Sequence, residues 1–277
     1  MLVLKLLLTP LFVGLIGLAD RRWGARVGGW LVGLPLTSAP VTAFVAFELG
    51  RAFAGHMAMA ILLGLISQAL FCLIYAWLSF RLNWFFCWLC GWGVFGLSTL
   101  ALEQITLPLS LAFLCVVGML VLVLALWPPA PDQTSDPMKA PAWAMPVRML
   151  LATGCVLALT TAASVLGPRL SGLLSPLPVF ATVFALVAHK LRGSGPARQI
   201  LRGVVLSSFA CAVFFLVVAD WIERWNGLMT FGGATCLALF TQGLLLWLQE
   251  RRISPGRCGP ARSRPIGSAE KGKFWPL

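Results

Sequence analysis

Charged residues are scarce in this chain of 277 residues: Asp, Glu, Lys and Arg make up 11% of it, against 59% hydrophobic residues. Its mean hydropathy is +0.90. A soluble globular domain carries about 25% charged residues. So few charges cannot cover a surface that faces water, which excludes a soluble fold. Intrinsic disorder is excluded as well, because it requires low hydrophobicity and high charge. The composition predicts an integral membrane protein.

Motifs of enzymes and cofactor-binding proteins are also missing. The sequence has no Gly-rich phosphate loop, no His-Glu-x-x-His and no Gly-x-Ser-x-Gly. Its histidines are His56 and His189, each next to a predicted loop. Cys87 and Cys90 have the spacing of a metal or redox pair, but they lie in an apolar run without a second pair or a nearby histidine. We interpret them as buried small hydrophobic residues, and we expect no cofactor, no metal and no enzymatic activity.

Long apolar runs account for most of the chain. A transmembrane helix takes about 20 apolar residues, and in lipid a helix satisfies its own backbone groups. The predicted fold is therefore all-α, a polytopic transmembrane helix bundle of about nine spans. The apolar segments are 2–19, 24–50, 55–80, 83–102, 105–127, 147–166, 168–189, 200–222 and 226–249.

Two stretches of the chain resemble each other at an offset of 143 residues. The aligned identities are Gly24 with Gly167, Arg26 with Arg169, Gly29 with Gly172, Leu34 with Leu177 and Pro35 with Pro178. Chance produces such matches in apolar sequence, but the shared order of arginine, small residues and Leu-Pro favours an internal duplication. The predicted organisation is a first membrane repeat (1–127), a polar Pro-rich linker (128–146), a second membrane repeat (147–250) and a basic disordered tail (251–277).

The net charge of +12 is interpreted through membrane topology, because Lys and Arg collect on the cytoplasmic side. Nine spans place most basic residues, with the C-terminal tail, in the cytoplasm. The two repeats are then inverted, an architecture common among transporters. If both Leu-Pro segments are instead re-entrant hairpins, seven spans remain and the repeats are parallel, with a similar charge asymmetry. The bilayer is the expected partner, and nucleic acid is not.

Each repeat carries prolines inside an apolar segment, and these prolines predict a broken helix. Backbone groups freed within a membrane are tolerated where they line a cavity or meet hydroxyl groups. Paired broken helices in two repeats indicate a substrate site, although a simple packing kink is the alternative. The candidate binding residues at these breaks are Pro35, Thr37, Ser38, Pro40, Pro178 and Thr182.

Two ionisable residues near the ends of these segments complete the candidate site. Glu48 ends the first Leu-Pro segment, and His189 lies near the matching place in the second. Ionisable residues within spans are functional-site candidates by default. The alternative is that both residues lie at the membrane surface and reach water there.

The segment from Leu177 to His189, LPVFATVFALVAH, resembles small bacterial inner-membrane proteins of the GlpM-like group. These proteins carry a similar proline-containing segment ending in Ala-Leu-x-Ala-His, followed by a glycine loop and another span. The similarity covers about residues 168–222. The first half departs from it, with Glu48 near the position that corresponds to His189. The resemblance implies a multi-pass protein of the bacterial inner membrane with a duplicated unit, and it supplies no catalytic residues.

The favoured function is transport of a small solute or an amphiphile, including a lipid-like one, through a site at the proline-broken helices. The alternative is a non-transporting scaffold or accessory subunit of envelope polysaccharide or lipid assembly. We expect the C-terminus to be cytoplasmic. The sequence names neither a substrate nor a protein partner.

Single cysteines introduced near Arg51 and Arg169 distinguish the two topologies. The nine-span arrangement predicts that an impermeant thiol reagent labels both positions from outside the cell. Labelling of both positions from the cytoplasmic side only would require seven spans and parallel repeats.

Overall fold

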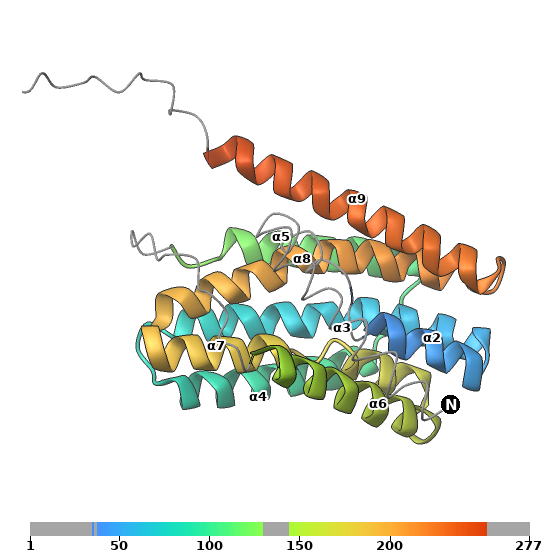
Figure 1. Cartoon of the computed structure of the whole chain (residues 1–277), viewed down its shortest axis with the longest axis horizontal. Helices are drawn as coiled ribbons and strands as arrows, with labels where there is room; N and C mark the ends of the chain where they lie inside the picture. The colour runs from blue at the N-terminus through green and yellow to red at the C-terminus, as the bar shows by residue number, and fades with distance from the viewer. Residues whose placement is uncertain (1–34, 36–37, 130–143, 254–277) are drawn as a thin grey trace, which may run out of the picture.

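The protein is described here by a computed structural model of residue 35 and residues 38–129 and 144–253. In that part of the chain every regular element is an α-helix (Figure 1), as predicted. The predicted span 2–19, Thr37, most of the linker and the tail beyond residue 253 lie outside the described residues. The helices are α2 (Ser38–Glu48), α3 (Arg51–Leu78), α4 (Trp84–Glu103), α5 (Leu109–Ala125), α6 (Ala144–Leu174), α7 (Val179–Arg192), α8 (Ser194–Trp221) and α9 (Gly227–Ile253).

Five helical segments are long and apolar enough to cross a membrane: α3, α4, the second part of α6, α8 and α9. Helix α5 is apolar as well but has only 17 residues. Large apolar side chains lie exposed on the outer helices, for example Leu97, Leu114 and Phe240. A soluble protein does not carry so much exposed apolar surface, and the arrangement is that of a multi-pass membrane protein.

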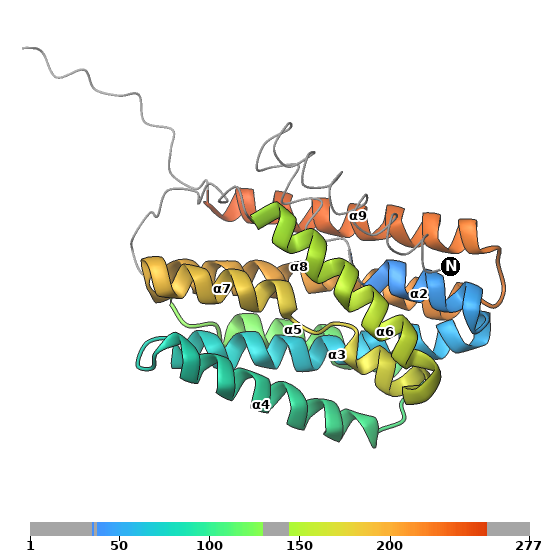
Figure 2. The ribbon, with the colours of Figure 1, turned by 60° about the horizontal axis from the view of Figure 1, so that its bottom comes forward.

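The helix boundary predicted between residues 166 and 168 is confirmed. Gly167 has non-helical backbone angles, φ 77° and ψ 170°, so α6 consists of two helices joined at a kink (Figure 2). The second of them stops at Leu174, and α7 starts at Val179. Between them lie Pro176 and Pro178, which have no backbone N–H. The predicted segment 168–189 is thus broken in its middle by its prolines.

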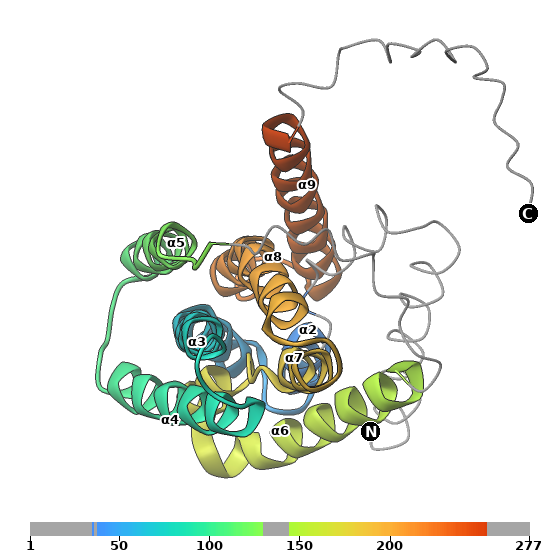
Figure 3. The ribbon, with the colours of Figure 1, turned by 90° about the vertical axis from the view of Figure 1, so that its left-hand side faces the viewer.

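Helix α3 is the centre of the bundle. It packs against α4, α5, α6 and α8, and Figure 3, which views the bundle end on, shows neighbours on several sides of it. Its side chains are predominantly apolar on every side, and most residues from Ala54 to Ala76 are buried. A helix that is apolar all round is a buried helix. Helix α9, by contrast, packs against α8 and projects from the bundle (Figure 3).

Contacts at both ends of α3 establish the directions of the helices. Arg51 at its start donates a hydrogen bond from Nη1 to the Trp225 carbonyl, just beyond the end of α8, at 3.5 Å. Near its end, the Tyr75 hydroxyl lies 3.1 Å from Nδ1 of His189, a few residues before α8 begins. Helices α3 and α8 are therefore antiparallel.

The two ends of the bundle carry different charges. At the first, the basic end, α3 and α7 finish and α8 begins (Figure 1). Residues at or near the basic end include Arg81, Lys190, Arg192, Arg198 and Arg202. At the opposite, acidic end, α2, α4 and α8 finish and α3 begins. Residues at or near the acidic end include Glu48, Arg51, Glu103, Arg169, Asp220, Glu223 and Arg224.

Helix boundaries recur at the offset of 143 residues. Helices α3 and α8 each have 28 residues, and their starts at Arg51 and Ser194 are 143 positions apart. The residues before them, Gly50 and Gly193, both have a positive φ, of 94° and 84°. Glycine adopts a positive φ at little steric cost, because it has no Cβ atom. Helices α4 and α9 start at positions that are also 143 apart, Trp84 and Gly227.

Glycine permits the close approach of α3 and α6. A Cβ atom on Gly172 would lie 2.5 Å from the Met57 carbonyl oxygen and 2.5 Å from the Ala60 Cβ. Backbone atoms of a buried helix cannot move aside locally, because interiors are close-packed. Gly172 is therefore required for this helix pair to pack.

Gly172→Ala is expected to destabilise the purified protein. Overpacking costs about 1–3 kcal/mol, which lowers the Tm by roughly 3–10 °C in a chain of this size. Gly203→Ala is the matched control, because no atom lies within 4 Å of its added Cβ. The control should leave the Tm unchanged or raise it slightly, since alanine favours helix. Equal melting temperatures for the two variants would contradict this packing.

Candidate functional site

The two proline segments meet inside the bundle. Helix α6 ends at Leu174 and α7 begins at Val179, and the intervening residues 175–178 are called the break below. Helix α2 begins at Ser38, three residues after Pro35. The Ser38 hydroxyl donates a hydrogen bond to the Ser175 carbonyl at 3.3 Å, and both residues are buried. This bond joins the start of α2 to the break, across 137 residues of sequence.

The break lies halfway along the bundle. Gly64 is at the middle of the 28 residues of α3. A Cβ atom on Gly64 would lie 2.8 Å from the Leu173 carbonyl oxygen and 2.9 Å from Cγ of Pro176. The backbone interruption is therefore at the same depth as the midpoint of the central helix, far from both charged ends.

Several buried hydroxyl groups belong to residues in the break or close to it in sequence or contact. Thr42 donates from Oγ1 to the Ser38 carbonyl at 2.8 Å, within the first turns of α2. Ser171, Ser175 and Thr182 are also buried, with at most 5% of each residue exposed. Their hydroxyl oxygens have no hydrogen-bond partner. Buried polar groups normally have partners, and three unpartnered hydroxyls close to one break in sequence mark it as the candidate binding site.

The structure gathers most of the predicted break residues. Pro35, Ser38, Pro178 and Thr182 are buried, and Pro40 lies partly buried in the first turn of α2. Thr37 lies outside the described residues. Ser171 was not predicted, although its position one helical turn before Ser175 on α6 is a signal that the sequence contains.

Glu48 and His189 do not join these residues or each other. Helices α2 and α7 both start in the middle of the bundle and run to opposite ends (Figure 1). Glu48 is therefore exposed at the acidic end of the bundle. His189 is at the basic end, within hydrogen-bonding distance of Tyr75. A single site that contains both residues is not formed in this structure.

A second polar cluster lies at the basic end of the bundle. Besides the contact of His189 with Tyr75, the guanidinium of the buried Arg198 lies 3.9 Å from the centre of the Phe80 ring. Arg198 also donates from Nη1 to the Pro129 carbonyl at 3.4 Å. Lys190 lies 6.0 Å from the Trp84 ring centre. Sequence reasoning missed Tyr75 and Arg198, although Tyr75 is the single tyrosine of the chain.

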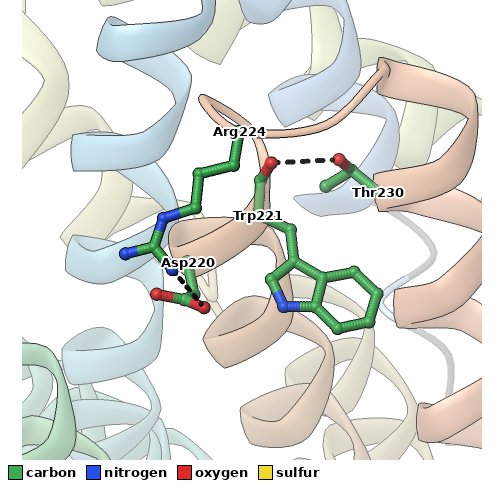
Figure 4. Close-up of polar contacts among 4 residues, drawn as sticks. All are labelled: Asp220, Trp221, Arg224 and Thr230. Atoms are coloured by element: carbon green, nitrogen blue, oxygen red, sulfur yellow. Dashed lines mark hydrogen bonds and ion pairs between the residues drawn. The ribbon is translucent and has the colours of Figure 1, made fainter.

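Aromatic and charged residues form a third cluster at the acidic end (Figure 4). Arg224 lies 3.5 Å from Asp220 one helical turn away, and the rings of Trp221 and Trp225 stack with centres 5.9 Å apart. The arrangement is typical of an aromatic belt at a membrane interface. A cleft of about 490 Å³ lies beside it, away from the break, and is lined by Leu109, Ser110, Leu216, Val217, Asp220 and Trp221.

Metal ligands do not gather in the described part of the chain. No group of three His, Cys, Asp or Glu side chains is placed to hold an ion among those residues. Cys87 is buried and lies 3.5 Å from the Leu82 carbonyl, whereas Cys90 is exposed. The two thiols therefore lie in different environments.

Ser38→Ala tests the bond between α2 and the break. Hydrogen bonds between membrane helices contribute about 0.6 kcal/mol on average and up to about 1.7 kcal/mol, so the Tm should fall by roughly 2–4 °C. Ser98→Ala is the control, because the Ser98 hydroxyl bonds to Val94 and Phe95 carbonyls of its own helix. A Tm for Ser38→Ala equal to or above that of Ser98→Ala would show that this bond does not stabilise the fold.

Comparison with protein-family models, with curated proteins and with solved structures gives no match for this chain. The resemblance of residues 168–222 to the GlpM-like group stays a prediction.

Proposed function

We propose that this protein is a membrane transporter with a substrate site where the start of α2 meets the break between α6 and α7. The observation that carries the proposal is the hydrogen bond from Ser38 to Ser175 at the depth of the middle of α3. Discontinuous helices that meet near the bilayer midplane are the usual setting of transporter sites. The substrate is a small solute or an amphiphile.

The recurring helix boundaries support two copies of one unit. Helices α3 and α4 of the first copy correspond to α8 and α9 of the second, at one constant offset. The positive φ of both Gly50 and Gly193 marks the same turn in each copy. Equal spacing of two turns and four helix starts is a stronger indication of duplication than the few aligned identities.

The directions of the helices support inverted rather than parallel copies. Corresponding helices α3 and α8 are antiparallel, and α5 lies between the copies in the chain. Arg169 donates to the Leu102 and Ile105 carbonyls at the end of α4, while Lys190 lies near Trp84 at its start. The second proline segment thus extends from one end of the bundle to the other, which favours nine spans over re-entrant hairpins.

The charge at the two ends supports one orientation in a membrane. Basic residues are enriched on the cytoplasmic side of membrane proteins, so the basic end faces the cytoplasm. Helix α9 ends there, which supports a cytoplasmic C-terminus. Together with the GlpM-like resemblance, this orientation leads us to propose the bacterial inner membrane as the location.

One observation favours the alternative of a non-transporting scaffold. Gly64 and Gly172 bring α3 and α6 into contact without space for a methyl group, and small residues are also the usual means of packing membrane helices rigidly. A scaffold keeps this single arrangement, whereas a transporter alternates between two. The number of conformations therefore distinguishes the two functions.

Spin labels on cysteines at Gln104 and Val165, both exposed near the acidic end, measure those conformations. The measurement is made in lipid nanodiscs with the native cysteines replaced. A transporter should give two distances between the spin labels, one for each of its two conformations. In the double variant Trp84→His with Lys190→His, the two histidines should bind one Zn²⁺ ion and hold the basic end closed. Only one distance between the spin labels at the acidic end should then remain.

The single substitution Lys190→His with the same Zn²⁺ concentration is the control and should not change the distances. One narrow distance that the clamp does not alter would overturn transport by alternating access and favour the scaffold.

A further inference from the structure

We infer that the site at the break binds an anionic oxygen group, such as a carboxylate or a phosphoryl group of a small organic anion. The inference rests on the proposed site and names the chemical class of its ligand. Its basis is that the groups gathered at the break are hydrogen-bond donors and the positive ends of two helices.

Two helix N-termini lie at the break. Helix α7 begins there, and α2 begins at Ser38, whose side chain touches it. Each helix start carries about half a positive elementary charge. The Ala39 and Thr182 N–H groups donate to the Pro35 and Pro178 carbonyls, whereas the first N–H groups of α7 have no partner within the helix. Neither first turn contains an acidic residue, and no side chain caps α7. Together the two starts offer roughly the charge that one anion needs.

Several carbonyl oxygens in and just before the break are already in use, among them that of Pro178, which accepts from the Thr182 N–H at 2.7 Å. The Gly172 carbonyl accepts from the Ser175 N–H at 3.0 Å, and the Leu174 carbonyl accepts from the Leu177 N–H at 3.1 Å. The Ser175 carbonyl accepts from Ser38. Prolines at 176 and 178 contribute no N–H groups that would need acceptors.

The donors, in contrast, remain available. The buried hydroxyls of Ser171, Ser175 and Thr182 have no partner. Each hydroxyl carries one proton that it can donate. A buried donor without an acceptor is unfavourable, and an anion with several oxygens accepts from more than one of them.

A cation is disfavoured by the position of the acids. Among the residues whose side chains the structure describes, each acidic residue lies at or within two residues of a helix end, far from the break: Glu48, Glu103, Asp220 and Glu223. Hard cations take several carboxylate and carbonyl oxygen ligands, and no acidic residue whose side chain the structure describes lies at the break. Basic residues at the cytoplasmic end, among them Lys190 and Arg202, would attract anions towards the bundle.

An introduced carboxylate tests the site without knowledge of the natural substrate. Thr182→Asp places the probe, a side-chain carboxylate, in the first turns of α7, and Thr182→Asn is the uncharged control of the same size. Melting temperatures of both purified variants are measured between pH 5 and pH 8 at one heating rate. If the site stabilises an anion, Thr182→Asp remains at least as stable as Thr182→Asn at pH 8.

The pH dependence of the Tm also shows whether the site disfavours an anion. A buried carboxylate without positive surroundings has a raised pKa, so its ionisation destabilises the fold as the pH rises. A Tm of Thr182→Asp that drops below that of Thr182→Asn between pH 5 and pH 8 would overturn the anion site. So would a Thr182→Lys variant that is more stable than Thr182→Asp at pH 8.

Folding failure is covered by a second pair of variants. If Thr182→Asn folds and Thr182→Asp does not, the anion site is overturned. If neither folds, Ser175→Asp and Ser175→Asn are compared in the same way. These measurements of stability do not depend on conformational exchange, so an anion site that holds while the spin-label distances stay single would leave a ligand-binding scaffold, not a transporter.

Discussion

The backbone interruption in the middle of the bundle is the feature on which the rest of the structure depends. Away from water, each polar backbone group has to find a partner within the protein. Prolines at 176 and 178 remove two donors, and turn-like bonds from Ser175 and Leu177 occupy neighbouring carbonyls. The hydroxyl of Ser38 occupies another. The start of α2 is thereby tied to the break, and the central helix needs glycine at 64 to pass beside it.

Close packing of α3 against α6 and the shielding of the polar break from lipid both require small residues beside the break. Helix α3 contacts α6 closely only because Gly64 and Gly172 lack side chains, and this closeness keeps the break away from lipid. A larger residue at either position would separate the helices and expose the break. The small residues are therefore as much a part of the candidate site as its hydroxyls.

The sequence was informative where a local chemical cause decides the outcome. Apolar runs predicted the helices, and Pro176 and Pro178 located an interruption, because a missing N–H acts wherever it occurs. The helix boundary predicted at residue 167 is present, because Gly167 adopts a positive φ and Pro168 follows it. Contacts between distant segments, such as Tyr75 with His189, have no local cause and were not predictable.

The separation of Glu48 from His189 follows from the same arrangement that brings the two helix starts together. Two short helices that begin at one central point and run to opposite ends bring residues at their starts together and separate residues at their C-terminal ends. Sequence alignment treats both kinds of position alike. It therefore grouped Glu48 and His189 with Ser38 and Thr182, although only the latter two lie at the start of a short helix, where the positive end of each is found.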